Sequence, residues 1–290
     1  MKRTRRVLLW AGGLLGAFLV GIGIWIGPSI YRSVVGVDAY ETTPPKLPAD
    51  LPSPAILVFS KTNGFRHDEA IVAANAMFRD LARDRTWSVY ATESGGVFNA
   101  AQLARFDAVV WNNASGDVLT PAQQAAFKDY LLAGGGFVGI HGSGGDPSYR
   151  WRWYVDELIG AQFIGHIMWP QFQRATIQVE DLDHPAMAGL PRLWERTDEW
   201  YSFDRSVRPA GYRVLATLDE SSYEPLGLLR GDLSMGGDHP IVWSHCVGNG
   251  RALFSALGHT GESYSEPQHR EMLANAVQWA VGKTACNDGQ

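Results

Sequence analysis

The sequence has few cysteines and no excess of positive charge. Only two of its 290 residues are cysteine, too few for a disulfide framework. Cys246 lies in an apolar strand-like run and Cys286 in the polar tail, and a bridge between them is one possibility. The formal net charge of -5 leaves no basic face for nucleic acid, so we expect no nucleic-acid partner.

Several signature motifs of catalytic and cofactor sites are also missing. The Gly-x-Ser-x-Gly elbow of serine hydrolases is not matched around Ser143, where the sequence reads His-Gly-Ser-Gly-Gly. The glycine-rich stretch 134–145 lacks the strand, turn and helix placement of dinucleotide sites, so we expect no nucleotide cofactor. No HExxH spacing marks a zinc site. Chemistry must therefore come from residues that distant segments bring together.

A long apolar run lies close to the N-terminus. Four Lys and Arg residues within the first six positions precede residues 7–26, which carry no charge and are long enough to span a bilayer core. Residues 27–32 offer no small-x-small cleavage site, so we predict a signal anchor over 1–30 with a transmembrane helix over 7–26. The alternative is a long signal peptide that is removed. The positive-inside rule places the remaining chain outside the cytoplasm, on a single-pass protein of the inner (cytoplasmic) membrane, in the periplasm or outside the cell.

A proline-rich stretch over residues 31–54 predicts a linker, and a single domain follows over 55–283. In the first part of this domain, apolar strand-like runs alternate with amphipathic helical patterns. The predicted strands lie at 55–60, 87–92, 108–111 and 137–140, and the predicted helices begin at 68 and 121. This alternation predicts an α/β fold, with a parallel sheet that helices cover on both faces.

The second part of the domain has a less regular pattern. The expected elements are a helix at 151–159, an edge strand at 175–179, strands at 212–218, 241–247 and 251–257, and a closing amphipathic helix at 267–281. Gly248-Asn249-Gly250 predicts a hairpin between two of these strands.

The chain is organised around the glycine-rich stretch 134–145. Phe137, Val138 and Ile140 form a short buried strand, and His141 follows it directly. Ligands of open α/β sheets bind at the carboxyl ends of strands, and glycine lets the backbone turn sharply there. His141 is therefore placed for chemistry.

The run Gly-Gly-Gly-Phe-Val-Gly-Ile-His-Gly resembles the strand and nucleophile elbow of the class I glutamine amidotransferase-like superfamily. A cysteine stands there at the position of His141, so we expect no glutaminase activity. The branch with this histidine is the ThuA-like, trehalose-utilisation family. The segments that also fit it are Asn63–His67, Ile159–Phe163 with His166, Asp183–Pro185, Thr197–Tyr201 and Leu257–His259. The resemblance covers about residues 55–282 and implies a flavodoxin-like fold and sugars or keto-sugars as substrates.

Three histidines follow predicted strands and are expected to meet at one edge of the sheet. They are His67, His141 and His259, and Glu199 is the expected carboxylate partner at this catalytic site. Imidazole and carboxylate suit a divalent ion such as zinc, with His141, His166 and His259 as the expected ligands. Metal-free acid–base catalysis is the other possibility, because histidine titrates near neutral pH.

The remaining polar candidates divide into two groups. The expected substrate-binding residues are Arg66, which would hold a substrate oxygen, together with Asn113, Asp198 and Trp200. The other histidines are expected to have structural roles: His184 in a turn and cap, His239 in a loop, His245 in the core and His269 on the solvent face of the last helix.

Two functions remain open from the sequence. One is a membrane-tethered enzyme that acts on a carbohydrate or keto-sugar by lyase, hydrolase or isomerase chemistry. The other is a non-catalytic, membrane-anchored glycan-binding domain, since the fold does not decide between them. Histidines that cluster within a few ångströms in a closed pocket favour the enzyme, whereas scattered histidines along a shallow aromatic groove favour the binder.

Overall fold

The computed structural model describes residues 20–21, 27, 31–32, 35–227, 231–282, 284 and 286. The described α-helices are α2 (Asp68–Arg85), α3 (Ala100–Leu103), α4 (Pro121–Leu132) and α5 (Pro267–Ala280). The strands are β1 (Ala55–Phe59), β2 (Ser88–Thr92), β3 (Ala108–Asn112), β4 (Gly136–Ile140), β5 (Phe163–His166), β6 (Gln173–Val179), β7 (Leu193–Asp198), β8 (Tyr201–Phe203), β9 (Arg213–Asp219), β10 (Leu226–Gly227), β11 (Gly231–Asp232), β12 (Pro240–Val247) and β13 (Gly250–Ser255).

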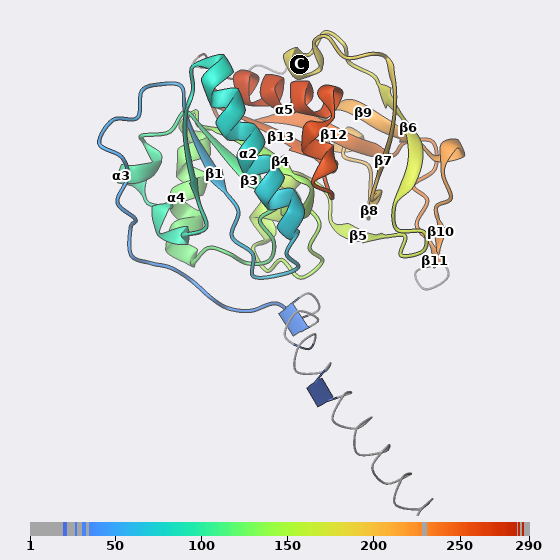
Figure 1. Cartoon of the computed structure of the whole chain (residues 1–290), viewed down its shortest axis with the longest axis horizontal. Coiled ribbons are helices and arrows are strands. Elements are labelled where there is room, and N and C mark those ends of the chain that lie inside the picture. The colour runs from blue at the N-terminus through green and yellow to red at the C-terminus, as the bar shows by residue number, and fades with distance from the viewer. Residues whose placement is uncertain are drawn as a thin grey trace, which may run out of the picture.

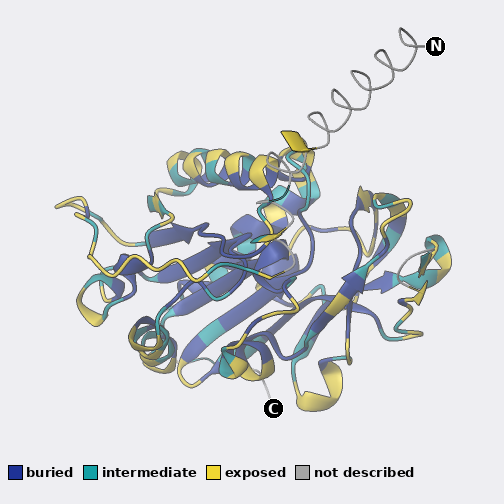
Figure 2. Cartoon of the chain, turned by 90° about the horizontal axis from the view of Figure 1, so that it is seen from below, coloured by how far each residue is buried: buried dark blue, intermediate teal, exposed yellow. Residues whose placement is uncertain are grey.

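One half of the central sheet is parallel, as the alternating pattern predicts. Its strands run in the order β2-β1-β3-β4-β13, and we call this set the parallel half. Strands β1, β3 and β4 are fully buried, because α2 and α5 cover one face of the sheet while α3 and α4 cover the other (Figure 1). Figure 2 shows these buried strands in the middle of the domain, with exposed residues on the outer sides of the helices.

The other half of the sheet is antiparallel, so the sheet is mixed and the predicted parallel arrangement holds only for the first half. Strands β12, β9, β6 and β7 continue the order from β13, and every neighbouring pair is antiparallel. We call this set the antiparallel half. The segments that join its strands contain turns and short 3-10 helices, whereas parallel neighbours need long crossover connections. The predicted hairpin at Gly248-Asn249-Gly250 is confirmed between β12 and β13.

Strand β6 is not the edge strand that the alternating pattern at 175–179 predicts. It pairs with both β9 and β7, and β7 forms the edge of the sheet. Its buried and exposed positions alternate because one face of the antiparallel half meets solvent, as is common for antiparallel sheets. An alternating pattern indicates that one face of a strand is exposed, and an inner strand can have an exposed face as well as an edge strand.

Helices α2 and α4 begin where the sequence predicts, and α5 ends one residue before the predicted span 267–281. The helix predicted at 151–159 is a shorter π-helix over Tyr154–Ile159. Acidic Asp68 and Glu69 occupy the first turn of α2, where negative charge suits the helix dipole. Thr120 and Gln123 form a capping box at the start of α4, with Pro121 at the first helical position.

The prediction that His269 faces solvent is wrong. The side chain is fully buried, and its Nδ1 donates to the carbonyl of Ser263 at 2.9 Å. One face of helix α5 packs on the sheet, and another packs against the 3-10 turn at Glu262–Ser265. The helix is therefore buried over more of its surface than its apolar pattern indicates.

His184 and His239 have their expected roles, whereas His245, expected in the core, is only half-buried. His184 caps the 3-10 turn that follows it, accepting a hydrogen bond from Ala186 N at 3.1 Å. His239 lies in the loop before β12, and His245 on β12 bonds the carbonyl of Leu158 at 2.9 Å.

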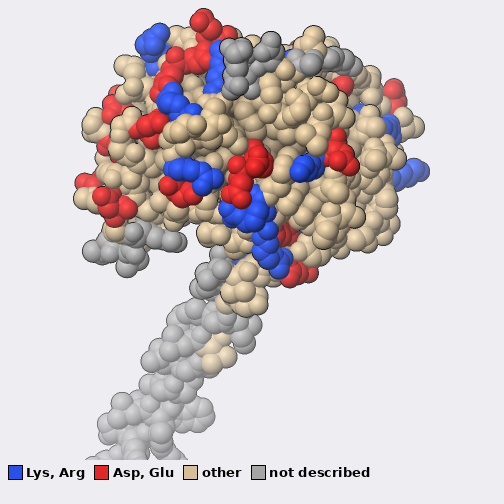
Figure 3. All heavy atoms as spheres, turned by 180° about the vertical axis from the view of Figure 1, so that it is seen from behind, with Lys and Arg blue, Asp and Glu red and all other residues tan. Residues whose placement is uncertain are grey.

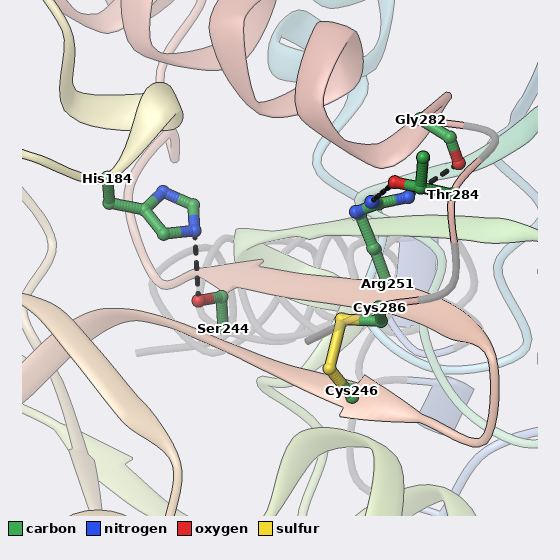
Figure 4. Close-up of a disulfide and its surroundings, with 7 residues drawn as sticks. All are labelled: His184, Ser244, Cys246, Arg251, Gly282, Thr284 and Cys286. Atoms are coloured by element: carbon green, nitrogen blue, oxygen red, sulfur yellow. Dashed lines mark hydrogen bonds between the residues drawn. A yellow bond between two sulfur atoms is a disulfide. The ribbon is translucent and has the colours of Figure 1, made fainter. Parts of the chain in front are cut away.

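The C-terminal tail is tied to β12 and β13 (Figure 4). The structure pairs Cys246 with Cys286, the bridge that the sequence left open. Arg251 adds hydrogen bonds to the carbonyl of Gly282 and the hydroxyl of Thr284. The same view shows His184 bonded to Ser244 of β12.

The segment before β1 packs against the domain. Glu41 forms an ion pair with Lys61 at 2.7 Å, and Asn63 donates to the carbonyl of Ala39. Most of the predicted transmembrane helix over 7–26 lies outside the described residues. Within the described part of the chain, no helix has the length and apolar character needed to cross a bilayer.

The surface carries both signs of charge. Figure 3 shows Lys and Arg side chains interspersed with Asp and Glu on the face opposite to that of Figure 1. The described part of that face therefore has no extended region of a single sign.

Candidate functional site

Three histidines from the parallel half meet at one edge of the sheet. His67 lies in the loop after β1, His141 directly follows β4, and His259 follows β13. Because these strands are parallel, their carboxyl ends share an edge. The ring centroids are 4.8 Å apart for His67 and His141, 4.6 Å for His67 and His259, and 5.2 Å for His141 and His259.

The backbone at the end of β4 is shaped to allow this approach. His141 has φ of +43°, a left-handed conformation that is costly for a residue with a side chain. Gly142 follows, and a Cβ atom there would lie 2.9 Å from Nδ1 of His67. Glycine at 142 is therefore needed for His67 to pack against the turn.

Glu199 comes from the antiparallel half and connects the histidines. It lies between β7 and β8, and its side chain is only 2% exposed. Its Oε2 is 3.0 Å from Nδ1 of His259 and 3.4 Å from Nε2 of His141. Its Oε1 is 3.1 Å from Nδ1 of His166 and accepts a hydrogen bond from Gln171 at 2.6 Å. One ring nitrogen from each of His67, His141 and His259 and one oxygen of Glu199 all lie within 4.8 Å of one another, and we call these four residues the histidine cluster.

The hydrogen bonds fix the protonation of His141. Its Nδ1 is 2.7 Å from the carbonyl oxygen of Ala256, which can only accept, so Nδ1 carries a proton. In the neutral ring, Nε2 therefore presents a lone pair to the cluster. The other nitrogen of His141 is 3.2 Å from Nδ1 of His259.

Burial and charge set the protonation of the neighbouring groups. Burial, together with the nearby rings of His141 and His259, holds the pKa of His67 well below its usual value. Burial raises the pKa of Glu199, but the adjacent imidazoles of His141 and His259 outweigh it, so the net pKa is well below the usual range. At neutral pH the site therefore combines a neutral imidazole at His67 with an ionised carboxylate.

Asp198 supports the site from beneath. It is fully buried and accepts hydrogen bonds from the backbone N–H groups of Gly258 at 2.8 Å and His259 at 3.2 Å. Burial raises its pKa, but the charge of Arg196, 3.0 Å away, outweighs this and keeps the pKa low. The predicted substrate-binding role does not fit these contacts, since the carboxylate holds the loop that carries His259.

The other predicted substrate-binding residues also bond to the protein itself. Arg66 pairs with Asp68 at 2.6 Å and with Glu93 at 2.8 Å. Asn113 is buried, accepting from Gly142 N at 3.2 Å and donating to the hydroxyl of Tyr264 at 2.9 Å. Trp200 is also buried, and its indole N–H donates to the carbonyl of Gln173. Asn113 therefore supports the turn after β4, and Trp200 is a core residue.

Sequence reasoning missed several residues that border the cluster. Tyr201 stacks on His141 with ring centroids 4.1 Å apart. Phe65 packs edge-on against His67 at 4.7 Å, and Phe172 lies 5.1 Å from His259, yet these rings are 47% and 42% exposed. We call Phe65 and Phe172 the aromatic rim. Only the folded chain shows that large exposed aromatic residues lie next to these histidines, although Tyr201 belongs to the sequence motif Thr197–Tyr201.

Comparisons with known proteins agree with this architecture. The sequence model of the ThuA family, described as trehalose utilisation, matches residues 55–280. No curated protein matches the chain. A ThuA-like protein of Bacteroides uniformis is similar in structure, with a TM-score of 0.68 and 28% identity over 83% of this chain and 96% of that one. A ThuA-like protein of Parabacteroides merdae shares the fold, with a TM-score of 0.59 and 16% identity over 81% of this chain and 92% of the other.

Proposed function

Because the chain belongs to the ThuA (trehalose utilisation) family, we propose that it is an enzyme acting on a carbohydrate or keto-sugar at the histidine cluster. The observation that carries the proposal is the convergence of three imidazoles and one carboxylate within 4.8 Å, in a largely buried site. Burying this many polar groups costs stability even where they pair with one another, so folding alone does not explain the cluster. A domain that only binds glycans needs no such cluster, so the enzyme is favoured over the binder.

The geometry suits the transfer of a proton next to a carbonyl group. Nε2 of His141 presents a lone pair, and His259 is held by Glu199 at 3.0 Å. In a keto-sugar the hydrogen on the carbon beside the carbonyl is acidic. One imidazole removes this proton, and the electron pair moves onto the carbonyl oxygen to give an enolate. In a lyase reaction the enolate expels the oxygen substituent on the next carbon as the second imidazole protonates it, whereas in an isomerase reaction the second imidazole protonates the carbonyl oxygen to give an enediol. This chemistry serves lyase and isomerase reactions alike.

The aromatic rim supports a sugar as the substrate. Phe65 and Phe172 are exposed and lie against the rings of His67 and His259. Apolar and aromatic side chains with a few placed polar groups are typical of small-molecule sites, and the C–H face of a pyranose can lie on such rings.

The enzyme is further proposed to be tethered to the membrane and to face the outside of the cytoplasm. Two features support this: the charge-free run over 7–26 behind basic residues, and the pairing of Cys246 with Cys286, because disulfides persist in oxidising compartments. An alkaline phosphatase fused to the C-terminus should be active in the producing cells. An inactive fusion in cells that make the full-length protein would contradict the topology.

The activity is tested with a panel of sugars. The purified full-length protein is incubated with trehalose, other disaccharides and their keto derivatives, and products are followed by mass spectrometry and NMR. We expect turnover of at least one keto-sugar, loss of turnover in His141→Ala, and retention in His245→Gln, a histidine outside the cluster. Binding of sugars without turnover by the folded wild type would favour the glycan binder instead. Glutamine, included in the panel, should not be hydrolysed.

A further inference from the structure

We infer that the histidine cluster binds a divalent transition-metal ion such as zinc. The ion would be held by His67, His141, His259 and Glu199. This inference deepens the proposed function by assigning a cofactor to the same site.

The spacing of the ligand atoms fits a metal ion. Zn–N and Zn–O bonds of about 2.0–2.2 Å in a tetrahedral arrangement separate neighbouring ligand atoms by about 3.3–3.5 Å. The distances are 3.2 Å from Nε2 of His141 to Nδ1 of His259, 3.4 Å from the same Nε2 to Oε2 of Glu199, and 3.0 Å from Nδ1 of His259 to that oxygen. These three atoms thus form a triangle close to one face of such a tetrahedron.

The hydrogen bonds leave Nε2 of His141 available as a ligand. Nδ1 of this ring lies 2.7 Å from the carbonyl oxygen of Ala256, so in the neutral ring the lone pair is on Nε2, 3.4 Å from the carboxylate oxygen of Glu199. The buried Nδ1 of His67 has no hydrogen-bond partner among the described residues, so this ring is held in the cluster by packing and not by a hydrogen bond of that atom.

The surroundings of the four ligands resemble those of a metal centre. Imidazole and carboxylate together suit zinc, iron and nickel. In such centres the second nitrogen of a ligand histidine donates to a carbonyl or carboxylate, as Nδ1 of His141 does to Ala256. The second oxygen of Glu199 is held by His166 and Gln171. His166, predicted from the sequence as a ligand, is here a positioning residue that orients Glu199.

With an ion bound, Nε2 of His141 and Nδ1 of His259 would act as its ligands instead of as the acid–base pair. The ion would then supply the Lewis acid that polarises a carbonyl or hydroxyl oxygen of a sugar.

The test measures metal binding directly and does not depend on activity. Full-length protein is purified in detergent, stripped with a chelator and reloaded with Zn²⁺ or Co²⁺, and the bound metal is measured by mass spectrometry. We expect about one ion per chain and visible absorption bands of Co²⁺ in a nitrogen and oxygen site. Glu199→Gln, which is nearly the same shape, and His141→Ala should each lose the ion. His166→Gln should weaken binding by about 10–100-fold, and His245→Gln should bind like the wild type.

The outcomes separate this inference from the proposed function. A folded wild type that takes up neither ion overturns the metal site, as does metal retained in both Glu199→Gln and His141→Ala. Stoichiometric metal that is lost in both variants sustains the site even when no sugar is turned over, a result that removes only the proposed activity. Sugar turnover that survives complete removal of metal overturns the inference and leaves the activity standing.

Discussion

The two halves of the sheet contribute different chemistry to one site. The parallel half supplies His67, His141 and His259, each from the carboxyl end of a strand. The antiparallel half supplies Glu199, from the connection between β7 and the short strand β8. The histidines occupy the usual ligand-binding edge of an α/β sheet, whereas the carboxylate comes from the added half. Neither half could form the histidine cluster alone.

The halves also differ in what they bury. Strands β1, β3 and β4 bury mainly apolar side chains between two layers of helices. Strand β7 buries an ion pair instead, with the side chain of Arg196 2% exposed and that of Asp198 fully buried. In the antiparallel half, the position of the loop that carries His259 therefore depends on the buried charges of Arg196 and Asp198. Four predictions test this contrast between the halves.

The largest expected effect comes from removing one cluster residue from each half. His141→Ala and Glu199→Gln should each lower kcat/KM by about 10²–10⁴-fold, because each removes an acid–base group or its partner. The double variant should be little worse than either single variant, since the groups act as a unit. Steady-state kinetics on the keto-sugar found in the panel gives the three values. Losses that multiply in the double variant would show that the two halves act independently.

The next effect concerns the buried ion pair of the antiparallel half. Arg196→Met should lower the free energy of unfolding by about 3–5 kcal/mol, because it leaves the carboxylate of Asp198 buried without its partner. Urea unfolding followed by circular dichroism measures the change. Arg174→Met on the neighbouring strand β6 is the matched control, since Arg174 is 73% exposed and should contribute little. Equal decreases in the free energy of unfolding of the two variants would show that the buried pair contributes no more to stability than an exposed one.

Sequence reasoning succeeds where local patterns decide the structure. The strands of the parallel half, the capping box at Thr120 and the placement of His141 after β4 all follow from short-range signals. Three histidines after three parallel strands then share an edge as a matter of topology. For this reason their meeting could be expected without any knowledge of the contacts.

The remainder depends on pairings between distant segments. No local signal indicates that β6 lies between β9 and β7, or that Gln171 reaches Glu199. Asp198 and Glu199 are neighbours in sequence but have different contacts. Asp198 accepts a hydrogen bond from the backbone of the loop that carries His259, whereas Glu199 contacts the His259 ring inside the cluster. The burial of His269 depends on the turn at 262–265, which packs on α5 from outside the helix.

A smaller effect is expected for the pH dependence of stability. Burial, with the nearby charge of Arg196, lowers the pKa of His269 on α5 to about 3. Below about pH 6.5 the unfolded chain binds a proton at this histidine, whereas the folded chain does so only near pH 3. The free energy of unfolding is therefore unaffected by His269 above pH 6.5 and decreases as the pH falls from 6.5 toward 3. His269→Asn keeps a donor for the carbonyl of Ser263 but cannot titrate. Between pH 6 and pH 4 its unfolding free energy should fall less steeply than that of the wild type, by up to about 1.4 kcal/mol per pH unit. Parallel stability curves for the two proteins would contradict this account.

The smallest effect is expected at the aromatic rim, where the two halves of the sheet border the same opening. Phe65 follows β1 of the parallel half, and Phe172 immediately precedes β6 of the antiparallel half. We expect both rings to contact the sugar equally in the bound substrate and in the transition state. Removing one ring then weakens the binding of both states by the same amount. Phe172→Ala should then raise KM about fivefold with little change in kcat, which corresponds to about 1 kcal/mol for one aromatic contact. Leu132→Ala is the control, because this exposed residue ends α4 and precedes β4, at the opposite edge of the sheet. A fall in kcat at unchanged KM for Phe172→Ala would instead mean that the ring shapes the cluster itself through its contact with His259.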